Sequence, residues 1–104
     1  MKRVNLEEIE AYDDKKFLRP EVLKGERSRT LLLCLRPGQS VPAHRHEGHE
    51  ILLHALRGEA DVTLDGEHVT VRAGDVVLVD GANDFAPVNN GEGNFSMLIT
   101  LVQK

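Results

Sequence analysis

Apolar runs and alternating apolar and polar positions follow one another through most of the chain after residue 28. Residues 30–35 form a near-continuous apolar run that ends at Pro37-Gly38, and residues 51–56 form another that ends at Gly58. Both runs have the length of a strand and end at residues that break regular structure. Similar short stretches predict further strands over residues 41–46, 60–64, 67–72, 76–79 and 95–102.

Short strands at a spacing of roughly 8–12 residues, with turn residues between them, predict an all-β sandwich or barrel. The clearest turn is Asp65-Gly66, because both central positions of a two-residue hairpin turn need a positive φ. After residue 28 the apolar residues show no 3.6-residue period that would predict a helix.

The first 27 residues are charged and weakly patterned. Residues 6–12 could form one helical turn or an extended arm, and the segments 17–20 and 21–24 read as short edge-strand pieces. Pro20 fits an edge strand because proline cannot donate a hydrogen bond to a neighbouring strand. We therefore expect an N-terminal arm with short edge strands over residues 1–27 and a barrel over residues 28–104.

The chain has 104 residues, close to the commonest size of a single domain. It holds three Phe, one Tyr and no Trp, so its core must come from Val, Leu and Ile. A chain this short buries only about two-thirds of its unfolded surface. Further burial between two copies would stabilise it, and we expect a homodimer.

The formal net charge is −4, and no block of Lys or Arg stands out, which argues against a nucleic-acid or acidic-membrane partner. No segment approaches the roughly 20 apolar residues of a membrane span, and the first residues carry acids in place of an apolar signal sequence. Cys34 is the only cysteine, so no intrachain disulfide can form, and it reads as a packed residue. These features predict a cytoplasmic protein.

Four of the five histidines, His44, His46, His49 and His54, fall within eleven residues. On a strand, residues at i and i+2 point to the same face, so His44 and His46 would present two adjacent imidazoles. With the carboxylate of Glu50 they would form a facial triad of the kind that binds non-haem iron. The alternative is a solvated, histidine-rich loop, in which His49 lies in the turn.

The segment from Gly38 to Glu50 resembles the first motif of the cupin superfamily: a glycine, five residues, His-x-His, three or four residues, then Glu. The segment that begins at Gly74, together with Asn89, resembles the second cupin motif in part. Phe85 stands where the family has a histidine. The resemblance covers roughly residues 28–102. It implies a single-domain, cupin-type double-stranded β-helix, or jelly-roll barrel, like the small "cupin 2" proteins.

The resemblance also implies a metal site at the mouth of the barrel. The usual family site has three His and one Glu, so a divalent transition metal (Fe, Mn, Ni or Zn) would be held by His44, His46 and Glu50. Phe85 cannot supply the fourth ligand, and His54 is the candidate to replace it.

One extra residue before Gly58 leaves the register of this segment open. Counting forward from His46 puts Glu50 in the ligand position, whereas counting back from Gly58 puts Ile51 there. A β-bulge between His54 and Gly58 would turn Glu50 and His54 inward. A bulge before residue 51 would instead turn inward Ile51, Leu53 and Ala55.

Three functions fit these residues. The first is a small metal-dependent cupin, acting by resemblance as a dioxygenase- or isomerase-type enzyme on a small organic molecule. The second is a metal-free barrel that binds or senses a small-molecule ligand, with Phe85 and Gln39 as candidate pocket residues. The third is a dimeric module with a purely structural role.

Overall fold

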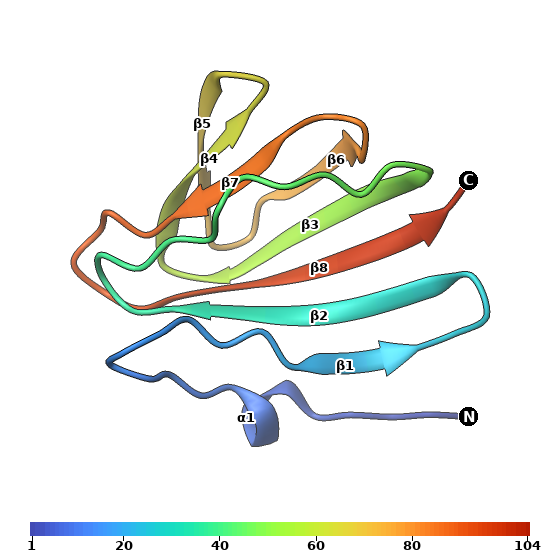
Figure 1. The fold of residues 1–104 in the computed structure, drawn as a ribbon. Helices are drawn as coiled ribbons and strands as arrows, with labels where there is room; N and C mark the ends of the chain where they lie inside the picture. The colour runs from blue at the N-terminus through green and yellow to red at the C-terminus, as the bar shows by residue number, and fades with distance from the viewer.

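The computed structural model describes all 104 residues and folds them into a β-barrel made of two antiparallel sheets (Figure 1). The single turn of helix α1 (Leu6–Ile9) precedes eight strands. The strands are β1 (Glu21–Lys24), β2 (Ser28–Leu35), β3 (His49–Arg57), β4 (Glu59–Leu64), β5 (Glu67–Arg72), β6 (Val76–Asp80), β7 (Phe85–Val88) and β8 (Phe95–Gln103). The all-β prediction is confirmed. No helix has the length and hydrophobicity that a membrane span requires.

The larger sheet has five strands in the order β1-β2-β8-β3-β6, and the smaller sheet has three in the order β5-β4-β7. The turn between β4 and β5 has φ values of 48° at Asp65 and 86° at Gly66, as the two-residue hairpin requires. Strand β7, which the hydrophobic pattern did not predict, pairs with β4 at the edge of the smaller sheet.

Residues 41–46 do not form the strand that the pattern predicts. They are extended and run along β7, where His44 and Phe85 exchange backbone hydrogen bonds of 3.1 and 2.9 Å. Val41 donates to the Pro87 carbonyl at 3.0 Å, but the pairing with β7 consists of two isolated bridges, at Ser40 and at His44. This segment carries the first two histidines across the mouth of the barrel.

The core lies between the two sheets and is mainly aliphatic, as composition predicts. The inner face of the larger sheet supplies most of it: Leu31, Leu33, Leu35, Ile51, Leu53, Ala55, Phe95, Met97, Ile99 and Leu101. The N-terminal segment extends the pairing along the edge of β2, where Leu18 and Cys34 form an antiparallel bridge with backbone hydrogen bonds of 3.1 and 2.8 Å. Cys34 is buried there.

Candidate functional site

His44 and His46 lie next to each other at the mouth of the barrel. The centroids of their rings are 4.8 Å apart and the ring planes are nearly perpendicular, at 86°. The two side chains share a face because they stand two residues apart in an extended segment, although that segment is not a strand. Both are half-buried.

Gly81, directly after β6, holds the histidine segment in place. Its carbonyl accepts a hydrogen bond from the His46 amide at 2.9 Å, and its own amide donates to the His49 carbonyl at 2.8 Å. A side chain at this position would collide with the carbonyl oxygens of His46 and His49, so only glycine allows this approach. The backbone of residues 46–49 is therefore fixed against the end of β6.

The structure does not bring Glu50 or His54 to the first two histidines, which corrects the expected ligand set. Strand β3 buries Ile51, Leu53 and Ala55 and turns the intervening side chains to the outer face of the larger sheet, where Glu50 and His54 are exposed. Burying three apolar side chains is favourable, whereas burying an unpaired carboxylate is costly.

The register of β3 does contain an irregularity between Ala55 and Arg57, within the stretch that the sequence analysis linked to an inward Glu50. That link was wrong. The irregularity lies beyond Ala55, at the end of β3 far from the mouth, so it leaves the alternation from His49 to Ala55 unchanged.

His49 belongs to the site, which the sequence analysis missed by placing it in the turn. It is the first residue of β3 and stands two and four residues before Ile51 and Leu53, so it shares their inner face. Counting back by twos from these buried residues is the signal that could have found it.

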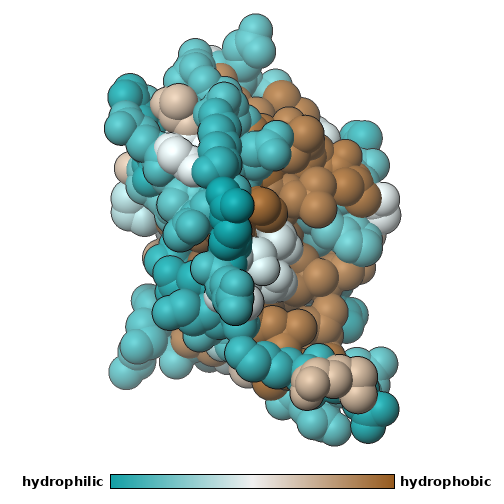
Figure 2. Space-filling view, turned by 90° about the vertical axis from the view of Figure 1, so that its right-hand side faces the viewer, coloured by the Kyte–Doolittle hydropathy of each residue, from teal (hydrophilic) through white to brown (hydrophobic).

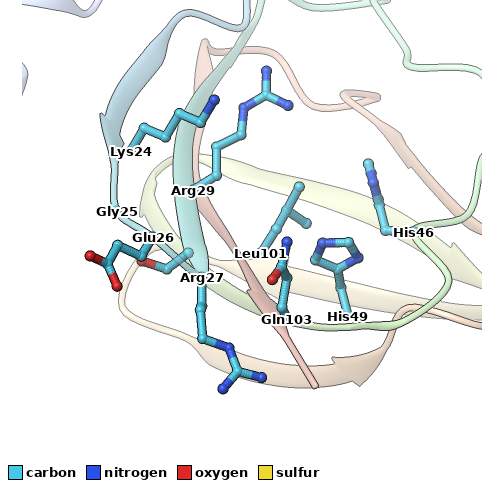
Figure 3. A pocket seen from close by; sticks show the side chains of 10 residues that line it. Lys24, Gly25, Glu26, Arg27, Arg29, His46, His49, Leu101 and Gln103 are labelled. Carbon is cyan, nitrogen blue, oxygen red and sulfur yellow. The ribbon is translucent and has the colours of Figure 1, made fainter.

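His46 and His49 line an open cavity of about 290 Å³ at the mouth of the barrel. Figure 3 shows these two imidazoles on one side of the cavity and Lys24 and Arg29 on the other. The remaining lining residues include a second arginine and a single acid: Gly25, Glu26, Arg27, Ser28, Leu101 and Gln103.

Positive charge surrounds His46. Its pKa is lowered first by burial and then by the charges of His44, Arg19, His49 and Arg29. Arg29 itself is paired with Glu21 at 2.7 Å, but both side chains are exposed enough for a ligand to compete. The electrostatics of the cavity favour an anion.

Two of the imidazoles are oriented by the backbone. Nδ1 of His44 lies 2.9 Å from the Pro42 carbonyl, and Nδ1 of His49 lies 3.1 Å from the Glu47 carbonyl. Because a carbonyl oxygen can only accept, each Nδ1 carries the proton, and in the neutral ring Nε2 keeps its lone pair.

The two predicted pocket residues lie outside this cavity. Phe85 is 1% exposed and packs in the core, with its ring edge-on to His44 at a centroid distance of 5.4 Å. Gln39 uses its side-chain amide within the protein: Oε1 accepts from the Arg36 amide at 2.8 Å, and Nε2 donates to the Asp13 carbonyl at 2.6 Å.

The donors present do not fit the four-ligand metal site that the family resemblance implies. No group of three or more His, Cys, Asp or Glu side chains is arranged to hold a metal ion. The cavity at the mouth is lined by imidazoles and basic side chains, with Glu26 as its one carboxylate. Any metal site here would have to use a reduced set built on His44 and His46.

Comparisons with known proteins agree on one fold. A family model described as a cupin domain matches residues 31–101. A curated relative, the oxalate-binding protein of Thermotoga maritima, is 32% identical over 68 residues, which make up 65% of this chain and 56% of that protein. The chain thus spans little more than half the length of that relative.

Two solved structures are similar over nearly the whole chain. A protein of Thermus thermophilus has a TM-score of 0.91 at 24% identity, over 99% of this chain and 98% of that one. An RmlC-like cupin of Desulfovibrio desulfuricans has a TM-score of 0.87 at 24% identity, over 98% and 96% of the two chains. These similarities confirm the jelly-roll barrel.

Proposed function

This chain belongs to the cupin domain family, and from that premise we propose that it binds a small organic acid in the cavity at the mouth of its barrel. The observation that carries the proposal is the lining of the cavity, in which three basic side chains, Lys24, Arg27 and Arg29, stand against one acid, Glu26. A cavity with cationic walls raises the local concentration of anions and binds them by charge-assisted hydrogen bonds.

The two sides of the cavity suit a carboxylate in different ways. Arg29 and Lys24 carry permanent positive charge, and a guanidinium matches the two oxygens of a carboxylate. On the other side, His46 and His49 supply imidazoles that become donors at Nε2 when they are protonated. The name of the curated relative, an oxalate-binding protein, supports a ligand of this class.

The test is calorimetric titration of tag-free protein with oxalate, malonate, succinate and acetate, using oxamide as an uncharged analogue of oxalate. We expect at least one acid to bind and oxamide not to. Arg29→Gln should weaken binding by about tenfold or more, because it removes a charge-assisted hydrogen bond.

Arg72→Gln is the matched control, because Arg72 pairs with Glu59 on an exposed surface in the same way as Arg29 pairs with Glu21. This variant should bind the acid like wild type. Equal losses in both variants, or binding of no acid in the panel, would overturn the proposal.

A second candidate is a divalent transition metal (Fe, Mn, Ni or Zn) held by His44 and His46 as its only protein ligands. The supporting observations are the 4.8 Å separation of the two rings and the contact between Nδ1 of His44 and the Pro42 carbonyl, because such contacts commonly orient metal-binding imidazoles. A bound ion would supply Lewis-acid or dioxygen chemistry, and the protein would then be a dioxygenase- or isomerase-type enzyme.

Elemental analysis of tag-free protein after reconstitution with each metal separates the two candidates. A metal-dependent site requires near-stoichiometric metal that the double variant His44→Ala, His46→Ala loses. Acid binding that persists in excess chelator, with no metal found, supports the metal-free binding barrel.

We also propose that the chain forms a homodimer and works in the cytoplasm. The small core supports self-association, because a chain of this length leaves about one-third of its surface unburied. The single buried thiol of Cys34 agrees with a reducing compartment.

A further inference from the structure

The outer face of the larger sheet carries an uncovered apolar patch. It lies on strands β8, β3 and β6, and we define it by the four exposed side chains Leu52 (40%), Val76 (61%), Leu78 (65%) and Val102 (37%). The N-terminal segment reaches β3 only at Arg57, the last residue of that strand, and leaves these four side chains exposed. Figure 2 shows hydrophobic side chains gathered along one side of the molecule.

The members of this patch are neighbours across the strands. Leu52 pairs with Leu78 of β6, and Glu50 pairs with Val102 of β8. A contiguous apolar area on a protein surface commonly marks an interface. The polar side chains at the border of the patch indicate which kind of partner it would bind.

Glu50 and His54 stand at equal distances on either side of Leu52, on the same face of β3. Each is two residues from Leu52, or about 6.8 Å along an extended strand. Neither side chain has an intrachain hydrogen-bond or ion-pair partner. An acceptor and a donor placed symmetrically about an apolar centre are complementary to a copy of themselves.

We propose that this face is the interface of the homodimer, with the two-fold axis crossing β3 at Leu52. The inference rests on the homodimer proposed above and specifies its geometry. A two-fold axis that lies midway between the two copies, parallel to the sheet and perpendicular to β3, reverses the strand direction and sets β3 over β3 of the second copy. Leu52 and Leu78 then meet their own counterparts, as a self-complementary interface requires.

The same rotation sets Glu50 of one copy opposite His54 of the other, and this contact occurs twice in each dimer. Two sheets packed face to face lie about 10 Å apart with strands nearly aligned, which lets these side chains meet. A histidine can donate to a carboxylate in its neutral and charged forms alike.

The first experiment measures the mass in solution of wild type and Leu78→Glu by sedimentation at several concentrations. Wild type should be a dimer and Leu78→Glu a monomer with an unchanged circular dichroism spectrum, because Leu78 is largely exposed within one chain. The control is Val69→Glu on β5, which places the same charge at an exposed valine of the other sheet. It should stay dimeric.

The second experiment exchanges the two border residues. Glu50→His and His54→Glu alone should each raise the dimer dissociation constant about tenfold, since each removes two hydrogen bonds per dimer. The double exchange restores the opposed pair and should return the constant to within a few-fold of wild type.

The outcomes separate the two proposals. A monomeric wild type would overturn the homodimer and this face with it. A dimer that survives Leu78→Glu would overturn the face alone, and single and double exchanges that weaken the dimer additively would overturn the two-fold axis at Leu52. Carboxylate binding in the cavity is unaffected by any of these results.

Discussion

The ring of Phe85 stands edge-on to the imidazole of His44, with centroids 5.4 Å apart, at the position where the second cupin motif has a histidine. Backbone hydrogen bonds in both directions between the two residues hold them in this register. The position of the missing fourth ligand is therefore next to the first histidine, and an apolar ring fills it.

Replacing that ring tests whether the site is one substitution short of a metal centre. Phe85→His should increase the affinity for Zn²⁺ or Mn²⁺ by at least tenfold, because it adds an imidazole beside His44 and His46. It should also cost about 3 kcal/mol of stability without metal, since a core aromatic is lost. Excess metal should recover part of that loss in a thermal melt.

Phe95→His is the matched control. Phe95 is as deeply buried as Phe85 but belongs to β8, where it pairs with Leu35 away from the mouth. It should lose similar stability, and metal should recover none of it. A metal-dependent rise in melting temperature of equal size in both variants would show that the imidazole beside His44 is not responsible.

Gly81→Ala should disrupt the site from outside it. The new methyl group would collide with the backbone carbonyls of His46 and His49, which cannot move without loosening the segment that carries the imidazoles. We expect a loss of roughly 1–3 kcal/mol in urea unfolding and weaker acid binding. Gly93→Ala is the control, because its added methyl group meets no atom within 4 Å. Equal behaviour of the two variants would contradict the proposed role of Gly81.

Much of the fold could be predicted from local pattern. The Asp65-Gly66 turn needs only its two residues, and the strands around it follow from alternation within single segments. The pairing of β3 between β8 and β6 depends on residues far apart in the sequence, which no local pattern fixes.

The site was harder to predict, because the side chains that β3 turns inward depend on whether Glu50 or Ile51 lies on its inner face. The motif spacing favours Glu50 as a ligand, while the apolar parity of Ile51, Leu53 and Ala55 favours the opposite face, and the structure follows parity. Giving burial more weight than motif spacing would have placed His49 inward. The cationic side of the cavity comes from Lys24 and Arg29 on β1 and β2, and only the fold brings these residues to His46.

Asn89, which matches the last residue of the second cupin motif, should prove structural. It is fully buried, and its side chain donates to the carbonyls of Leu35 and Gly93 at 2.9 Å each and accepts from the Gly91 amide at 3.1 Å. Asn89→Ala leaves these groups without partners and should cost roughly 2–4 kcal/mol in urea unfolding. Asn90→Ala removes one exposed hydrogen bond and should change little. Comparable losses in both would refute the assignment.

The carboxylate of Glu10 should stabilise the position of the N-terminal segment over Cys34. Its Oε2 accepts from the Tyr12 hydroxyl at 2.6 Å and from Arg57 Nε at 2.7 Å, and the Tyr12 hydrogen bond is the main cause that lowers the pKa of Glu10. Glu10→Gln should cost about 1.5–3 kcal/mol at pH 7. It should also speed labelling of the buried Cys34 thiol by a disulfide reagent, because the covering segment opens more often.

The pH dependence follows from the direction of that shift. A carboxyl group whose pKa is lower in the folded state than in the unfolded state, where it is about 4.3, stabilises the fold fully above that value. This contribution disappears as the pH falls through the lowered folded pKa. The stability difference between wild type and Glu10→Gln should therefore be constant near neutrality and shrink below about pH 4.

The control is Glu59→Gln, which breaks an exposed ion pair with Arg72 and should change neither stability nor labelling rate appreciably. A gap between wild type and Glu10→Gln that persists undiminished at about pH 3 would show that the Glu10 charge does not hold the segment.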